Sequence, residues 1–132
     1  YWIGQGIERF VLSVGYRHEV IETHFGLSYR GARVNYAVEE SPLGTGGGVL
    51  LAAESLGTAE PFLLLNGDTY FAVNLELLDR FGAEHDADWS FCLFRAREAG
   101  RYMGLSTSPD GRIVALRSDD QEIGRLANGG VY

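Results

Sequence analysis

Residues 39–48, EESPLGTGGG, form the first segment whose residue types suggest chemistry. Four of the five residues from Gly44 to Gly48 are glycine, and the segment joins an expected strand to an expected helix. Glycine lets backbone N–H groups approach a ligand closely, and a helix N-terminus favours an anion or a hydrogen-bonding base edge. The segment lacks the GK[ST] of a P-loop and does not fit the GxGxxG dinucleotide pattern. The structural alternative is a flexible connection with Thr45 as an ordinary helix N-cap.

Asp68 is the second candidate, because it follows the apolar run of residues 61–65 in the sequence PFLLLNGDT. A carboxylate beyond the carboxyl end of a buried strand can hold Mg²⁺ through one oxygen, while substrate phosphates and waters complete the octahedron. The sequence therefore predicts a magnesium site with one protein carboxylate. The alternative is that Asp68 only caps its own turn, which is common for an isolated NGDT sequence.

The elements that must position these two loops alternate between strand and helix. Strand patterns are expected at residues 9–14, 33–39, 61–65 and 89–95, and helical patterns at residues 17–25, 49–56 and 74–85. Residues 109–111, PDG, favour a hairpin after the last of these. The alternation predicts an α/β fold, a three-layer α/β/α sandwich around a Rossmann-like, mostly parallel sheet with a small antiparallel portion.

The composition fits one globular domain over residues 1–132, since 45% of the residues are hydrophobic and 22% are charged. The formal net charge is −7, and all 11 basic residues are arginine. An acidic chain without a basic stripe argues against binding nucleic acid or an anionic membrane, whereas a phosphate-bearing small molecule can still bind to glycine loops and helix N-termini. Cys92 is the only cysteine, so no intrachain disulfide forms and a cytoplasmic protein is expected.

Four segments in order along the chain resemble the sugar-1-phosphate nucleotidyltransferase family, particularly its mannose-1-phosphate and heptose-1-phosphate guanylyltransferase branches. They are SPLGTGGGVLLAAESL at 41–56, FLLLNGDTYF at 62–71, DGRI at 110–113 and NGGVY at 128–132. The resemblance implies that a nucleoside triphosphate, with GTP favoured, is joined to a sugar 1-phosphate in the presence of Mg²⁺. The sugar-phosphate oxygen would attack the α-phosphorus in line and release pyrophosphate.

The resemblance also implies roles for particular residues. The nucleotide base and ribose would bind to Glu39, Gly44, Thr45 and Gly46. The metal and the nucleotide phosphates would bind to Asp68, with Gly67 beside it. The sugar phosphate would contact Gly104, Asn128 and Gly129.

Three departures from the family pattern qualify these roles. The family's triphosphate-wrapping GxGxR…K loop belongs upstream of Tyr1, so the chain is expected to be a core domain truncated at both ends. The family's Glu-Lys pair falls on residues 116–119, LRSD, where Arg117 is the one cation, and its RYG falls on residues 101–104, RYMG. Transfer of another nucleotide and a catalytically silent nucleotide-sugar-binding or regulatory module remain the alternatives, and a homo-oligomer is left open.

Overall fold

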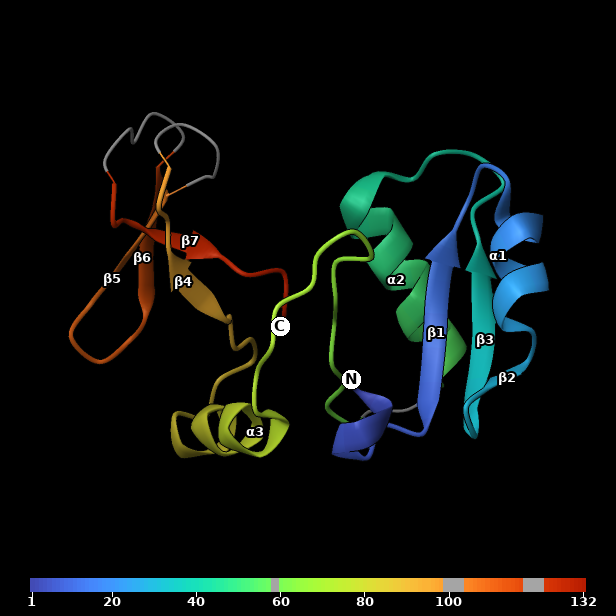
Figure 1. The fold of residues 1–132 in the computed structure, drawn as a ribbon. Helices are drawn as coiled ribbons and strands as arrows, with labels where there is room; N and C mark the ends of the chain where they lie inside the picture. The colour runs from blue at the N-terminus through green and yellow to red at the C-terminus, as the bar shows by residue number, and fades with distance from the viewer. Residues whose placement is uncertain (58–59, 99–103, 118–122) are drawn as a thin grey trace. The chain divides into compact units, whose positions relative to one another are not determined.

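The computed structural model describes residues 1–57, 60–98, 104–117 and 123–132 (Figure 1). The chain divides into two compact units, Tyr1–Pro61 and Phe62–Tyr132, and each unit is described here by itself. A single domain over residues 1–132 stays a prediction.

A three-stranded sheet with two helices forms the N-terminal unit. Its elements are η1 (Ile3–Gln5), β1 (Arg9–Val14), α1 (His18–Phe25), β2 (Ser28–Tyr29), β3 (Ala32–Val38) and α2 (Gly44–Leu56). β1 and β3 pair in parallel, and β2 pairs antiparallel to the other edge of β3. The buried side chains of Val14, Ala32, Val34 and Ala37 form its core.

Helices α1 and α2 cover opposite faces of this sheet (Figure 1). Ser13 faces α2, because its hydroxyl oxygen lies 3.0 Å from the position that a Cβ on Gly48 would take. Tyr36 faces α1, because its hydroxyl donates to the carbonyl oxygen of Gly26, just after that helix, at 2.7 Å. Ser13 is paired with Ala37, the neighbour of Tyr36, and successive strand side chains point to opposite faces. The unit therefore has the expected order of helix, sheet and helix.

Helix α2 is also tied to β1 at its C-terminus. The Arg9 guanidinium donates to the carbonyl oxygens of Ser55 and Leu56, each at 2.8 Å. A cation at this position stabilises the negative end of the helix dipole and satisfies carbonyl groups that lack helical partners.

None of the helices in the described ranges has the length and apolar character that crossing a membrane requires.

The C-terminal unit combines one helix with a sheet whose described pairs are all antiparallel. Its elements are α3 (Leu75–Glu84), β4 (Leu93–Arg95), β5 (Gly104–Thr107), β6 (Ile113–Arg117) and β7 (Leu126–Asn128), and the strand order is β4-β7-β5-β6. The Asn74 side chain caps α3 by accepting from the Leu77 N–H at 2.9 Å. Gly111 takes the left-handed φ of 87° in the β5–β6 turn. The hairpin is confirmed, and α3 lies within the helical pattern expected at residues 74–85.

Residues 61–65 differ from the strand expected there. Leu65 forms one isolated bridge with Val131, and Leu64 exchanges two backbone hydrogen bonds of 3.0 Å with Tyr132. Gly130 beside them has a φ of 72°, so its segment departs from the extended conformation at that residue.

The α/β class is confirmed, with more antiparallel pairing than the sequence indicated. Among the described residues, parallel pairing is confined to β1 and β3. The sheet of the C-terminal unit is therefore larger than the small antiparallel portion that the PDG turn suggested.

Candidate functional site

The glycine-rich segment is the first turn of α2 rather than a loop before it. The helix begins at Gly44, whose φ of 71° is left-handed, and its N-cap residue is Leu43. Thr45 thus lies inside the helix, so the alternative in which Thr45 is the N-cap is wrong. The cap residue makes no side-chain hydrogen bond to the helix. The backbone N–H groups of this turn, which include Gly44, Thr45 and Gly46, therefore lie where an anion or a base edge is favoured.

Glu39 fixes the approach of the chain to this turn. Its Oε2 atom accepts a hydrogen bond from the Leu43 N–H at 3.0 Å, and its Oε1 atom accepts one from the Ser13 hydroxyl at 3.2 Å. The negative charge of the carboxylate is also stabilising beside a helix N-terminus. Glu39 is half-buried, follows β3 directly and belongs to the same local arrangement as the glycine turn.

Glycine occupies the positions of this turn for different structural reasons. A Cβ on Gly47 would lie 2.5 Å from the Leu43 Cβ atom, and one on Gly48 would lie 2.6 Å from Glu39 Oε1. Those two glycines are needed for packing within the protein. No heavy atom lies within 4 Å of the Cβ position of Gly44 or Gly46. The space beside these two residues is open to a ligand.

Asp68 lies in an exposed turn of the C-terminal unit. Its Oδ1 atom accepts a hydrogen bond from the Thr69 hydroxyl at 3.1 Å, and Gly67 beside it has no heavy atom within 4 Å of its Cβ position. Among the described residues, no group of three or more His, Cys, Asp or Glu side chains is placed to hold a metal ion. An exposed, oxygen-bearing carboxylate fits a Mg²⁺ ion whose other ligands are phosphates and waters.

The NGGVY segment lies directly beside the Asp68 turn, although the two are far apart in the sequence. The Asn66 N–H donates to the Gly130 carbonyl oxygen at 2.9 Å, and a Cβ on Gly130 would lie 2.9 Å from Asn66 Nδ2. A Cβ on Gly129 would lie 2.7 Å from the Phe71 ring. Asn66 and Phe71, which precede and follow Asp68 in the sequence, thus contact residues 130 and 129, respectively.

Asn128 shapes the turn that follows it. Its Oδ1 atom accepts from the Gly130 N–H at 2.9 Å, and its Nδ2 atom donates to the Tyr132 hydroxyl at 2.6 Å. Gly104 is buried in β5 and pairs with Ala127, the residue before Asn128. The structure therefore brings the sugar-phosphate candidates of the sequence together in one unit. Residues 101–103 and 118–119, which the sequence analysis also considered, lie outside the described residues.

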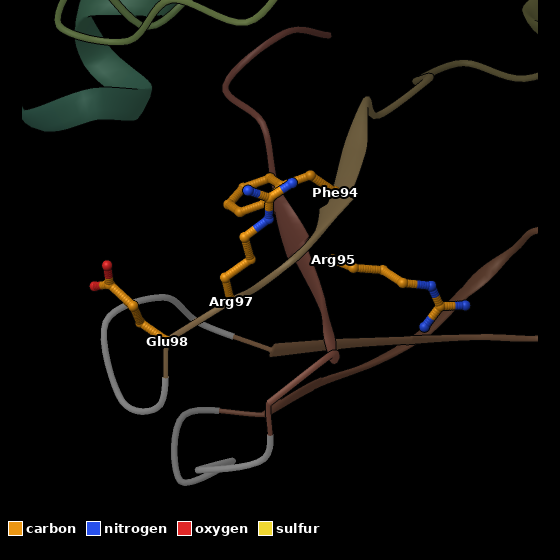
Figure 2. Close-up of a pocket in the computed structure, with 4 residues that line it drawn as sticks. All are labelled: Phe94, Arg95, Arg97 and Glu98. Carbon is orange, nitrogen blue, oxygen red and sulfur yellow. The ribbon is translucent and has the colours of Figure 1, made fainter.

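A surface pocket of about 220 Å³ lies next to this arrangement and was not expected from the sequence (Figure 2). It is lined by Phe94, Arg95, Arg97 and Glu98. The Phe94 ring centroid is 5.9 Å from that of Phe71, which packs on Gly129. In Figure 2 the Arg97 side chain turns toward the Phe94 ring, whereas Arg95 points to the other side and donates to the Gly124 carbonyl oxygen at 3.0 Å.

The sequence motifs missed Ser13, Asn66 and Phe71. Each acts on a candidate residue through a contact: Ser13 on Glu39, Asn66 on Gly130 and Phe71 on Gly129. The only signal for Ser13 was a hydroxyl within the otherwise apolar run FVLSV. Asn66 and Phe71 flank Asp68 in FLLLNGDTYF but have no ligand role that residue type alone would indicate.

The N-terminal unit thus carries a glycine-rich helix start, and the C-terminal unit carries an exposed aspartate beside an Asn-Gly-Gly turn. The chain belongs to the nucleotidyl transferase family, whose model matches residues 2–119.

Several relatives narrow the comparison. The chain is 39% identical over 128 residues to the D-glycero-α-D-manno-heptose 1-phosphate guanylyltransferase of Aneurinibacillus thermoaerophilus, covering 97% of this chain and 55% of that protein. It is 32% identical over 130 residues to the mannose-1-phosphate guanylyltransferase of Mycobacterium tuberculosis, covering 96% of this chain and 36% of that protein. The chain thus spans about half the length, or less, of these relatives.

The fold also matches a solved structure. HddC from Yersinia pseudotuberculosis, in its complex with GMP-PN, superposes with a TM-score of 0.75 over 99% of this chain and 57% of that protein, at 24% sequence identity. This likeness confirms the fold.

Proposed function

We propose that the full-length protein containing this chain transfers the nucleotidyl group of a nucleoside triphosphate, preferentially GTP, to a heptose or mannose 1-phosphate. The observation that carries the proposal is the 39% identity to a heptose 1-phosphate guanylyltransferase over 97% of this chain, which spans both the glycine turn and the Asp68 turn. Because nucleoside triphosphates are intracellular metabolites, we place the reaction in the cytoplasm.

The two parts of the candidate site have complementary roles in this proposal. In the N-terminal unit, the open backbone at Gly44 and Gly46 binds the nucleotide, and the Glu39 carboxylate accepts hydrogen bonds from its base or ribose. In the C-terminal unit, Asn128 and the Gly129 backbone orient the sugar phosphate beside the Asp68 turn. Positioning of this kind lowers the entropy cost of bringing two reactants together.

Asp68 would hold the Mg²⁺ ion, which supplies neutralisation of phosphate charge when bound. An oxygen of the sugar 1-phosphate forms a bond to the α-phosphorus, and the bond from that phosphorus to the bridging oxygen breaks. Pyrophosphate leaves with the bonding electrons. The backbone N–H groups at the start of α2 and the Asp68 carboxylate do not change their covalent state during the reaction.

The test is an assay of pyrophosphate release by the full-length protein. Four nucleoside triphosphates are combined with heptose, mannose and glucose 1-phosphates, with Mg²⁺ and with excess chelator. We expect GTP with a heptose or mannose 1-phosphate to give the highest kcat/KM, and chelator to abolish turnover. Undiminished turnover in chelator would contradict the metal role, and nucleotide binding without turnover by any pair would support the silent binding module instead.

A further inference from the structure

Ser13 and Glu39 meet where two parallel strands end. Ser13 is the fifth residue of β1, and the Glu39 N–H continues the ladder by donating to the Val14 carbonyl oxygen at 2.8 Å. The strand pairing thus brings the serine hydroxyl to 3.2 Å from Glu39 Oε1. The carboxyl ends of parallel strands are where α/β proteins bind ligands. The Ser13 hydroxyl is therefore a neighbour of the candidate nucleotide site without being part of any motif.

The two hydrogen bonds to Glu39 use one acceptor position on each carboxylate oxygen. Leu43 N–H donates to Oε2, and Ser13 donates to Oε1. A carboxylate has about four lone-pair positions, so each oxygen keeps one for a further donor. A free glutamate side chain loses rotamer entropy when it is fixed, and the two bonds fix it before a ligand arrives.

Gly48 leaves room for this arrangement. It is buried in the first part of α2, and a Cβ there would lie 2.6 Å from Glu39 Oε1 and 3.0 Å from Ser13 Oγ. Alanine is otherwise more favourable than glycine inside a helix. The glycine is therefore explained by the position of the carboxylate above it.

We propose that Ser13 is a positioning residue that orients the Glu39 carboxylate toward the nucleotide base, so that the Ser13–Glu39–Gly48 contact contributes to base selection. The proposal rests on the proposed function. Guanine presents adjacent N–H donors on N1 and N2, which match the two remaining lone pairs of a carboxylate held in one orientation. Adenine presents one donor and one acceptor side by side on the same edge, and this acceptor would repel the carboxylate.

The first measurement compares Ser13→Ala and Ser13→Thr in the full-length protein, with Ser55→Ala as a control. Ser55 donates its hydroxyl to the Leu51 carbonyl oxygen within α2, away from Glu39. Calorimetry with GTP and Mg²⁺ gives the affinity, and steady-state kinetics give KM for GTP, ATP and the sugar 1-phosphate. For Ser13→Ala we expect GTP affinity to fall about threefold to tenfold, discrimination against ATP to narrow, and KM for the sugar 1-phosphate to stay unchanged. Ser13→Thr keeps the hydroxyl and should restore the affinity.

The second measurement asks whether Ser13 acts through Glu39. In a Glu39→Ala background, Ser13→Ala should have no further effect on GTP affinity, because the interaction it supports is already gone. Gly48→Ala should weaken GTP binding as Ser13→Ala does, since the added methyl group displaces the carboxylate. An equal loss from Ser13→Ala in both backgrounds, or unchanged affinity with only a lowered unfolding temperature, would overturn the proposal.

The outcome for the wild-type protein separates this proposal from the proposed function. If wild type turns over GTP and Ser13→Ala does so with unchanged affinity and selectivity, the role of Ser13 is wrong and the enzyme function stands. If wild type binds GTP without turnover, the enzyme function is wrong, and the binding data on the same variants still decide the role of Ser13. If wild type binds no nucleotide, both are wrong.

Discussion

Asp68 lies in an exposed turn, where its carboxylate accepts one hydrogen bond from Thr69. Neighbouring backbone supports the turn, since the Asn66 N–H donates to the Gly130 carbonyl oxygen. The carboxylate itself contributes little to packing at this position. Under the proposed function, the carboxylate would supply the charge that a metal requires.

Replacing Asp68 by Asn in the full-length protein should separate these two roles. Asn keeps the shape and removes the charge, so we expect kcat at saturating Mg²⁺ to fall by at least about 100-fold. The free energy of unfolding should change by less than about 1 kcal/mol. Asp79→Asn, the same change at an exposed position of α3, is the control for both measurements. Near-normal turnover with a clearly lowered unfolding midpoint would show that Asp68 is a structural cap.

Gly46 allows a similar separation in the glycine turn. Because no heavy atom lies within 4 Å of its Cβ position, Gly46→Val should fold, with a loss of stability of about 1 kcal/mol or less. The side chain would fill the space assigned to the nucleotide, so we expect GTP affinity to fall by at least about tenfold. Gly4→Val, at another glycine with nothing within 4 Å, is the matched control in calorimetry. Unchanged GTP affinity of the Gly46 variant would move the nucleotide away from this turn.

At the scale of elements, the sequence predicted the features that depend on neighbouring residues better than those that depend on pairing between distant segments. The helical pattern at 74–85 placed α3 correctly, and PDG placed the β5–β6 hairpin, because both depend on residues close together in the sequence. The run at 61–65 forms an isolated bridge and not the expected strand, because its pairing depends on residues 131–132, which are far away in the sequence. Ser13 was invisible for the same reason, since its contact with Glu39 follows from the register of β1 against β3.

Cys92 reports on the packing of the segment next to β4. It is 9% exposed, its N–H donates to the Val131 carbonyl oxygen at 2.9 Å, and burial raises the pKa of its thiol. We expect the native thiol to react with a disulfide reagent much more slowly than the denatured chain at pH 8, because less thiolate is present and access is reduced. Equal rates in the native and denatured protein would show that this segment is open.

The raised pKa of Cys92 also predicts a direction for stability against pH. The neutral thiol is favoured in the folded protein, so its contribution is fully present below the unfolded pKa of about 8.5. It is lost as the pH rises from that value through the folded pKa. Cys92→Ser should remove this part of the pH dependence in denaturant unfolding measured on the alkaline side.

At the scale of the whole molecule, the chain has a formal net charge of −7, and under the proposed function it would bind two phosphorylated substrates. Long-range attraction cannot supply the affinity, since the net charge repels anions and is screened beyond about 10 Å in ordinary salt. Under the proposed function, local groups would supply it instead: the N–H groups at the start of α2, a divalent cation at Asp68, and Arg95 and Arg97 of the pocket beside Phe94. The family could be predicted from the motif order, whereas contacts that orient the site needed the structure.

Residues 130–132 complete the support of the Asp68 turn, since Asn66 and Leu64 find their backbone partners there. During synthesis these partners leave the ribosome after the turn itself, and at about 5–20 residues per second the delay is on the order of several seconds. Until then, the NGD segment lacks these two backbone partners. A nascent chain would therefore complete the glycine turn of α2 before the Asp68 turn gains this support.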